Sequence, residues 1–483
     1  MFPDFYFSPQ RNIKYSKIIS KEFKNEFVKF IFAISNVYKQ NIPIFIGNYS
    51  YQKKSLTKQS YFHMKRNIHL VILIFLIFFA ISFLTNILGS INPNVSDSFL
   101  LNGTMTGLLP FSFFIAYALM SIPSGMIVQK YDEKKSLVFA WILAFCGALL
   151  FSLFPVFPVF LCSLFLIGCG MALLQVALFP LLRVTGGEEH FAFNNLIVQL
   201  VFGVASFLSP FVYSFLVTNL GNKDLTKGLF INTMAFLTPN KLPWVSIYWI
   251  FTFICFVMVA IILMVRFPKV VRKEDEIVGA WETHLELFRQ KAVILFFLGI
   301  FAYVGMEQGI ANWISEFLRT YHGFKPEAEG AATVGLFWGM MTVGCVLGLV
   351  LLKIIDSKIV LRIFASAAFI VLTLTLFGNA RMALYGFPAM GFCLSVMYGI
   401  IFSLALNSIT KYHGSFAGIL CTAIAGGAIF SLLIGKLKDL IGLQAGMMIL
   451  FLPLCYILSL SFWAKPIVRN AVIRRKNQPN IKN

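Results

Sequence analysis

The sequence predicts an all-α membrane protein whose twelve transmembrane helices form two pseudo-symmetric halves of six. Of its 483 residues, 58% are hydrophobic and only 12% are charged, against about 25% charged in an ordinary soluble domain. Apolar runs of about 20 residues, the length that crosses a hydrocarbon core as a helix, recur from Asn67 to Lys465. A soluble fold would lack the polar residues to cover its surface, so we expect the lipid bilayer to surround the chain.

The apolar runs place the individual spans and divide the chain into domains. Spans are predicted at 68–91, 104–128, 136–154, 157–182, 193–217, 243–266, 291–317, 329–352, 359–378, 383–408, 415–434 and 441–464. The first six form an N-terminal bundle, 67–266, and the last six a C-terminal bundle, 291–465. A cytoplasmic inter-domain loop, 267–290, joins the two bundles.

Basic residues indicate which membrane face each loop occupies, because short loops rich in lysine and arginine stay in the cytoplasm. With the N-terminus inside, both tails and the even-numbered connections hold about 32 of the 40 basic residues. We therefore expect a multi-pass protein of the cytoplasmic (inner) membrane with both termini cytoplasmic. Topology also explains the net charge of +20 better than nucleic acid does, since no groove combines basic and aromatic residues.

The two ends of the chain differ from the spans. Residues 1–66 are rich in Lys, Phe, Ile and Asn, and Lys29, Lys39 and Pro43 interrupt their apolar patch. They lack the short apolar core and cleavage site of a signal peptide. We expect a basic cytosolic extension, either disordered or lying ahead of a true start at Met64, and a basic cytosolic tail at 466–483.

Each half has a basic turn after its second predicted span. The first runs from Gly125 to Lys135 and the second from Gly348 to Lys358. An internal repeat is the simplest explanation of this correspondence, and two related bundles of helices are the plan of many transporters.

The first basic turn resembles the inner-loop signature of the major facilitator superfamily. The residues at its signature positions are Gly125, Lys130, Asp132, Lys134 and Lys135. Gln129 stands where the signature is usually acidic, and Asp132 stands at its usual second glycine. The resemblance implies the twelve-helix facilitator fold. It also implies that these residues help to hold the two halves closed on the cytoplasmic side.

Pieces of six spans resemble the fucose permease and glucose/galactose transporter family, over about residues 68 to 464. Their order and spacing make the resemblance, since no single piece is specific. The pieces are Phe83–Thr85 with Pro93, Leu174–Ala177 with Pro180, His190–Phe191 with Asn194, Tyr303–Glu307, Leu336–Gly339 and Ala425–Ala428.

Several positions depart from that family. Leu88 and Gly89 stand where an Asn-Asp pair is typical of span 1, Phe179 replaces an asparagine before the span-4 proline, and Cys345 replaces an arginine in span 8. Gln175 matches the glucose/galactose members, whereas fucose permease has a glutamate. The proton-handling carboxylates of the fucose type are absent, so the resemblance does not bring that coupling mechanism with it.

A sugar presents hydroxyl groups and C–H faces, which neutral amides and aromatic rings can recognise. Side chains of these types lie on polar stripes within several spans, and the family resemblance implies sugar contact at Gln175. The substrate-binding candidates are Asn86, Gln175, Gln199, Gln308, Asn312, Trp313 and Tyr398. The alternative for Asn86, Gln175 and Tyr398 is a structural role in packing neighbouring helices.

Glu307 is the candidate for ion coupling. It lies near the middle of span 7, where an ionised carboxylate is costly unless it faces water, a partner or a cation. Such a group can load and release a proton or help to coordinate sodium. The alternative is a structural hydrogen bond or ion pair that locks the helix. We expect no cofactor other than a coupling proton or sodium ion.

Enzyme and metal chemistry have no support in the sequence. The eight cysteines lie in apolar runs without ligand spacing, and no Walker loop, HExxH or GxSxG pattern occurs. The leading hypothesis is a monomeric secondary transporter that moves a monosaccharide or related small polar solute by alternating access, with spans 1, 4, 7 and 10 lining its cavity. The alternatives are a diverged exporter or antiporter of other small molecules, and a non-transporting membrane receptor or scaffold.

Overall fold

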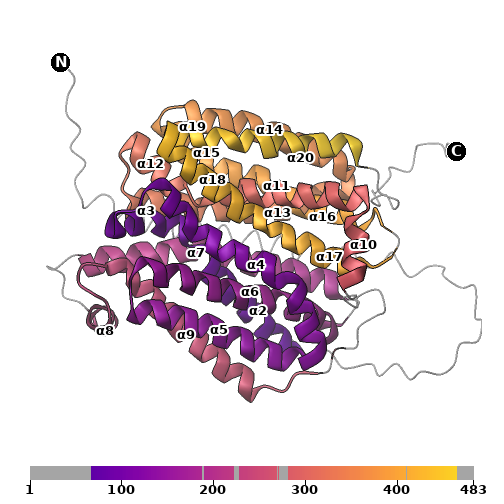
Figure 1. The fold of residues 1–483 in the computed structure, drawn as a ribbon, viewed down its shortest axis with the longest axis horizontal. Coiled ribbons are helices and arrows are strands. Elements are labelled where there is room, and N and C mark those ends of the chain that lie inside the picture. Colours follow the sequence, from indigo (N-terminus) through magenta and orange to yellow (C-terminus); the bar gives the residue numbers. More distant parts are fainter. Residues whose placement is uncertain are drawn as a thin grey trace, which may run out of the picture. The chain divides into compact units, whose positions relative to one another are not determined.

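The computed structural model describes residues 67–187, 190–221, 228–268, 270, 281–409 and 411–464. The predicted extension at 1–66, the predicted tail at 466–483 and the middle of the predicted inter-domain loop, 271–280, lie outside the described residues. Within the described ranges the regular secondary structure is helical, without a strand. Figure 1 shows the long helices of both halves lying roughly along one axis.

The described residues of the first half form eight α-helices, drawn from indigo to rose in Figure 1. They are α2 (Ile68–Thr85), α3 (Leu88–Phe99), α4 (Gly103–Tyr131), α5 (Glu133–Leu153), α6 (Phe157–Gly186), α7 (Phe191–Gly221), α8 (Leu229–Leu237) and α9 (Ser246–Met264). Asparagine begins two of them: the side-chain oxygens of Asn67 and Asn102 accept hydrogen bonds from the backbone N–H three residues further on, at 3.3 and 2.8 Å. Such caps satisfy backbone donors that the first helical turn leaves free.

The second half follows a short helix, α10 (Trp281–Phe288). Its members are α11 (Lys291–Ala311), α12 (Ile314–His322), α13 (Ala331–Ile354), α14 (Ser357–Phe377), α15 (Ala380–Leu394), α16 (Met397–Leu406), α17 (His413–Thr422), α18 (Gly426–Ile441), α19 (Leu443–Met447) and α20 (Phe451–Trp463). A π-helical turn, Pro326–Gly330, leads into α13.

Among the described residues, twelve helical segments are long and apolar enough to cross a membrane, which confirms the predicted number. Several combine two helices; α2 with α3 makes the first span, and α15 with α16 makes the tenth. The predicted end of the eleventh span at residue 434 is too early, because α18 continues to Ile441. Its last turns contain Lys438 and Asp439. Charged residues are typical of a loop, but here both side chains find partners on other helices.

Each half has its own apolar core, in agreement with the predicted two-bundle fold. One cluster of buried side chains extends from Val71 to Ile262 and includes Ala331 and Ala428 of the second half, where the halves meet. A second extends from Leu287 to Ala464. Tryptophan and tyrosine anchor the first: Trp244 and Tyr248 of the sixth span surround Phe151 and Phe160, whose rings stack at 4.2 Å.

The halves contact each other chiefly through two pairs of spans, α4 with α18 and α7 with α13. Small residues allow the first crossing, because a Cβ on either Gly103 or Gly435 would collide with the carbonyl oxygen of the other. In lipid, where the solvent is as apolar as the side chains, close backbone approach of this kind drives helix association.

The first span of each half is broken at an asparagine. Asn86 ends α2 and Asn312 ends α11, and each backbone N–H still bonds to the carbonyl four residues earlier. A backbone break inside a membrane is tolerated only where neighbouring groups satisfy the freed atoms. The amide of Asn86 donates to Ser206 at 2.7 Å, and that of Asn312 donates to the Gln308 carbonyl at 2.8 Å.

The two basic turns are related but not equal. Asp132 and Asp356 each stand immediately before the third membrane span of their half, α5 and α14. Asp356 has ordinary backbone angles, and its side chain caps Lys358 N at 2.8 Å. Asp132 instead has φ 68° and ψ 160° and makes no capping bond. That region is almost confined to glycine, which explains why the signature usually has glycine at this position.

We predict that Asp132→Gly stabilises the protein. A Cβ in this backbone region costs about 1–3 kcal/mol, so its removal stabilises the folded state by that amount. The greater conformational freedom of glycine in the unfolded chain offsets up to about 1 kcal/mol of this stabilisation. The transition temperature in detergent micelles should therefore rise. Asp132→Ala, which removes the charge but keeps the Cβ, is the control and should give no increase. An equal rise for both variants would assign the effect to charge and not to backbone strain.

Candidate functional site

The alternating spans give the described bundle two membrane faces. We name them by the aspartates beside the first two connections. Spans 1 and 2 join at Leu100–Asn102, near Asp97, and this side is the Asp97 face. Spans 2 and 3 join at Asp132 on the opposite side, the Asp132 face. The halves are tied at the Asp97 face, and the cavity described below extends towards the Asp132 face.

An ion-pair network crosses between the halves at the Asp97 face. Arg319 of α12 contacts Asp97 at the end of α3 at 2.6 Å and Glu316, one helical turn away, at 2.7 Å. The second oxygen of the buried Glu316 accepts from Lys438 of α18 at 2.6 Å. Burial alone would lower the pKa of Arg319, but the carboxylates of Asp97 and Glu316 outweigh it and raise that pKa, so the guanidinium stays charged.

Two further contacts join the halves at the same face. The carboxylate of Asp439 accepts from the backbone N–H groups of Gly103 and Thr104 at 2.6 and 2.7 Å, and from the Thr104 hydroxyl at 2.6 Å. These donors form the N-terminus of α4, where a negative charge is favoured by the helix dipole. Deeper in the bundle, the amide of Asn92 donates to the carbonyl oxygen of Asn312 at 2.9 Å.

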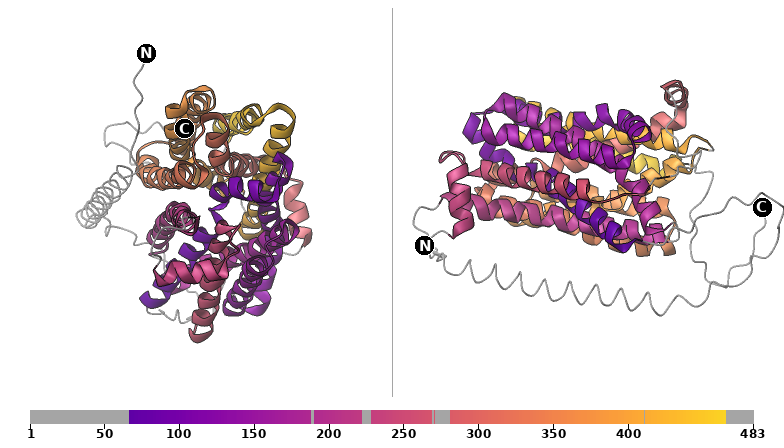
Figure 2. Two further views of the ribbon diagram at one scale, coloured as in Figure 1. Left: turned by 90° about the vertical axis from the view of Figure 1, so that its left-hand side faces the viewer. Right: turned by 90° about the horizontal axis from the view of Figure 1, so that it is seen from below.

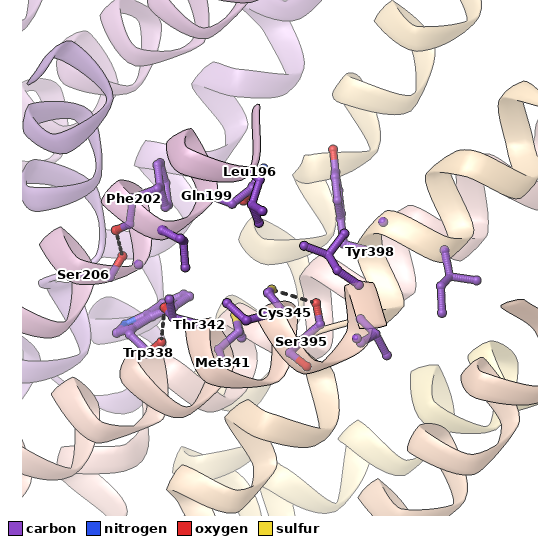
Figure 3. A pocket seen from close by; sticks show the side chains of 18 of the residues that line it. Leu196, Gln199, Phe202, Ser206, Trp338, Met341, Thr342, Cys345, Ser395 and Tyr398 are labelled. Carbon is purple, nitrogen blue, oxygen red and sulfur yellow. Dashed lines mark hydrogen bonds between the residues drawn. The ribbon is translucent and has the colours of Figure 1, made fainter. Parts of the chain in front are cut away.

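A cavity of about 370 Å³ lies between the halves, within the range of sites for small molecules. Its walls come from α7 on one side and from α11, α13 and the α15–α16 junction on the other (Figure 3). A neighbouring cavity of about 280 Å³ shares Leu352 and Ile400 with it and reaches Lys353 and Ser357. Those two residues flank the turn between α13 and α14, so the hollow extends towards the Asp132 face.

Glu307 is the charged group of this site. The described residues that line the larger cavity include no other Asp or Glu and no Lys, Arg or His. It is half-buried on α11. The side-chain amide of Gln308 donates to its carboxylate at 2.9 Å, and the Tyr303 hydroxyl, one turn earlier on the same helix, forms a second hydrogen bond. The helix thus supplies two donors to a carboxylate placed at mid-membrane.

Aromatic rings and unsatisfied polar atoms complete the lining. The rings of Tyr303 and Tyr398 lie 5.6 Å apart, and Trp338 lines the cavity from α13. Nε1 of Trp338 and Oδ1 of Asn195 are buried without a hydrogen-bond partner among the described residues. One is a donor from the second half and the other an acceptor from the first. Buried polar atoms are normally paired. Both residues line the cavity, but these two atoms are inaccessible in this conformation, so the lining must rearrange before a ligand with hydroxyl groups can bond to them.

The structure brings three of the predicted site residues together. Gln199, Glu307 and Tyr398 all line the cavity, from α7, α11 and α16; Figure 3 shows Gln199 and Tyr398 on opposite walls. Asn86 lies one contact behind the lining, because its amide donates to the hydroxyl of Ser206, which does line it. The cavity is formed by spans 5, 7, 8 and 10, whereas the sequence predicted spans 1, 4, 7 and 10.

The other predicted site residues lie outside the lining. Gln175 is half-buried within α6. Gln308 and Asn312 are buried, and Asn312 lies 3.4 Å from the Ser431 hydroxyl of α18. Trp313 is fully buried, with its indole N–H donating to the Ser431 carbonyl at 3.3 Å and the Lys438 ammonium 5.5 Å from its ring centre. In this conformation the cavity lining does not include Gln308, Asn312 or Trp313. Asn312 and Trp313 instead pack against Ser431 of α18.

The signature residues act within their own half in this conformation. Lys134 donates to the carbonyl of Leu263, near the end of α9, at 2.9 Å. Lys358 of the second half makes the corresponding bond to the carbonyl of Phe462, near the end of α20, at 3.3 Å. Each lysine therefore caps the last span of its own bundle.

The remaining signature residues lie around that turn. Gly125 is buried in α4 and Lys135 is exposed. The ammonium of Lys130 lies 5.2 Å from the ring centre of Tyr131.

Several residues that line the cavity were not among the site residues predicted from the sequence. These are Asn195, Ser206, Tyr303, Trp338, Thr342 and Ser395. A signal existed for Tyr303, because it is one helical turn from Glu307 and so on the same face. Thr342 has no such signal: its hydroxyl donates to the Trp338 carbonyl at 2.9 Å, a bond that serine and threonine make throughout membrane helices.

Proteins of known function that resemble this chain are transporters, not enzymes. A glucose/galactose transporter of Brucella abortus biovar 1 (strain 9-941) is 30% identical over 387 residues, which cover 79% of this chain and 90% of the relative. An L-fucose-proton symporter of Escherichia coli (strain K12) is 24% identical over 368 residues, which cover 70% of this chain and 81% of the relative.

Solved structures share the fold. A crystal structure of the E. coli fucose:proton symporter, determined on a single-substitution variant, aligns with a TM-score of 0.59 at 20% identity, covering 82% of this chain and 99% of that one. An inward-facing, unoccupied bacterial homologue of the human lysosomal transporter Spinster aligns with a TM-score of 0.67 at 15% identity, covering 83% and 97%. The sequence profile of the Major Facilitator Superfamily matches residues 74–432 of this chain. The chain therefore belongs to the major facilitator superfamily, as its loop signature and the order of its motifs predicted.

Proposed function

We propose that this protein is a secondary active transporter that moves a monosaccharide or a related small polar solute across the inner membrane by alternating access. The observation that supports it best is the cavity between the halves, which is lined by the aromatic rings of Tyr303, Trp338 and Tyr398, the amides of Asn195 and Gln199, and one carboxylate, Glu307. Relatives that are named glucose/galactose transporters point to the same class of solute.

The charge of the cavity narrows the solute further. The described lining of the larger cavity contains Glu307 and no lysine, arginine or histidine. An anionic sugar would face this carboxylate without a compensating cation, and like charges at short range in a poorly hydrated site repel strongly. The favoured substrate is therefore neutral and polyhydroxylated.

Alternating access accounts for the unequal faces of the bundle. The ties at the Asp97 face close one end, while the cavity reaches the Asp132 face. By the distribution of basic residues the Asp132 face is cytoplasmic, so the conformation described here is the inward-facing one. A return to the outward-facing state would break the contacts of Arg319 and Asp439 and bring the basic turns of the two halves together.

Glu307 is the proposed coupling group. Its hydrogen bonds from Tyr303 and Gln308 keep it on the cavity wall, where a proton or sodium ion can reach it. Occupation by either cation would neutralise a charge that is costly inside the membrane. Substrate and cation would then share one small site, which links the two binding events.

The direct test is uptake into proteoliposomes. With wild-type protein, glucose, galactose or fucose should accumulate when a proton or a sodium gradient is imposed. Glu307→Gln should still exchange sugar across the membrane at equal concentrations, but it should no longer accumulate sugar, because the cation has lost its carboxylate. Glu286→Gln, which removes an exposed charge on α10, is the control and should behave as wild type.

Each alternative gives a different result in that assay. Uptake that ignores both gradients would contradict the coupling and leave a uniporter. Failure of every sugar to exchange would favour an exporter or antiporter of other compounds. Sugar binding without any flux would favour a receptor or scaffold.

We predict that Trp338 contributes both a ring face and a donor to sugar binding. Trp338→Phe keeps the face and loses the N–H, which should weaken binding by about threefold to tenfold, since a net hydrogen bond is worth about 1 kcal/mol. Trp338→Ala should weaken it by about a further fivefold, because an aromatic contact is worth about 1 kcal/mol. Calorimetry on purified protein measures both. Equal affinities for wild type and Trp338→Phe would exclude the donor role.

Asp439→Ala should favour the outward-facing state. The carboxylate is exposed, so solvent screening limits its bonds to the α4 N-terminus to about 1 kcal/mol, or about fivefold in population. A Ser96→Cys reporter, buried in this conformation, should then react about fivefold faster with a membrane-impermeant maleimide. Peptide mass spectrometry measures the label at residue 96 separately from any label on the native cysteines. Lys436→Ala, an exposed charge on the same helix, is the control. Unchanged labelling in Asp439→Ala would show that this tie does not set the balance.

A further inference from the structure

The connection between spans 5 and 6 contains an additional helix, α8, at the Asp97 face. It lies between Gly221, the last residue of α7, and Pro243, which begins the sixth span. The corresponding connection of the second half, between spans 11 and 12, is the single residue Gly442. This helix therefore breaks the symmetry of the two halves and is not needed to join two spans.

The outward surface of α8 is apolar. Leu229, Phe230 and Phe236 are 87%, 52% and 89% exposed, and the exposed polar positions between them are the uncharged Asn232 and Thr233. Residues 229–238 contain no charged side chain. A surface helix in water normally presents charged residues outward, and such large apolar side chains would be unfavourable there.

The opposite surface of α8 is packed against the protein. Ile231 and Thr238 are buried, and the helix contacts both α7 and α9. Figure 2 shows α8, in rose, lying across the end of the bundle and not along it. Because the spans cross the membrane, a helix that lies across their ends runs parallel to the membrane plane.

We propose that α8 is an interfacial helix whose apolar face is buried at the boundary between headgroups and acyl chains of the leaflet at the Asp97 face. Phospholipid is the partner because the two helices that hold α8 already present large apolar side chains to lipid: Phe215 on α7 is 53% exposed and Phe253 on α9 is 66% exposed. α8 packs against both of these helices. Interfacial helices are recognised by such an arrangement of an apolar face and low charge.

The consequence is mechanical and rests on the membrane fold, not on the proposed substrate. Among the described residues, an outward apolar helix of this kind is attached to the first half, and the equivalent connection of the second half cannot hold one. The first half is thereby fixed at a defined depth in the membrane. Movement between the halves then displaces the second half relative to the bilayer.

Photo-crosslinking of the full-length protein in phosphatidylcholine/phosphatidylglycerol nanodiscs tests the assignment. Benzoylphenylalanine replaces Phe236 in one sample and Leu229 in another, which avoids the native cysteines that a thiol label would modify. Phe253, on a membrane span, is the lipid-exposed control position. Lys241, exposed in the turn after α8, is the water-exposed control. After irradiation, intact-mass spectrometry measures the fraction of protein that gains one phospholipid.

The expected result is a phospholipid adduct at positions 229 and 236 within about twofold of that at 253, and about fivefold or more above that at 241. An adduct at 236 no greater than at 241 would place α8 in water and overturn the proposal. A crosslinked dimer in place of the lipid adduct would also overturn it, and would assign the face to a second copy of the chain. The uptake assay is independent, so a failed lipid adduct leaves the transport proposal standing.

Discussion

The absence of water from the hydrocarbon core is the constraint on which the rest of this structure depends. A buried polar group that finds no partner within the protein is therefore costly. Serine and threonine avoid this cost by donating to their own helix, as Ser121 does to Tyr117 and Thr252 to Tyr248. The helix breaks lie at Asn86 and Asn312, whose side-chain amides donate to the Ser206 hydroxyl and the Gln308 carbonyl. A carboxylate at mid-membrane, Glu307, occurs where the lining supplies donors.

The same constraint explains the position of the ionic contacts between the halves. The network of Asp97, Arg319, Glu316 and Lys438 and the contacts of Asp439 lie at the Asp97 face, where water can solvate the charges when the contacts break. Deeper between the halves the described contact is a single amide bond, from Asn92 to the carbonyl oxygen of Asn312. Under the proposed alternating access these contacts open and close, and such a contact is less costly to break at the water boundary than inside lipid.

Pseudo-symmetry provides the framework, and departures from it mark the specialised parts. The lysines of the two basic turns make equivalent bonds to the last span of their own half, and asparagine ends the first helix of each half. By contrast, Asp132 occupies a backbone region that its counterpart Asp356 avoids, and α8 has no equivalent in the described part of the second half. The cavity is also unequal, since the first half lines it through α7 alone whereas the second half contributes three spans.

By itself the sequence determined the number of spans, the two-bundle plan and the family, because hydrocarbon thickness sets the length of an apolar run and the signature turn is local. It also singled out Glu307 as a candidate site residue, since a charge in the middle of a span is visible without coordinates, and Glu307 lines the cavity. The partners of these groups depended on tertiary structure. The sequence could not reveal that Gln199 and Tyr398 face one cavity while Trp313 packs against Ser431, or that Lys438 and Asp439 tie the halves together. Those contacts join residues more than a hundred positions apart, and they are set by how the helices cross and rotate, which the apolar pattern of an all-round hydrophobic span does not encode.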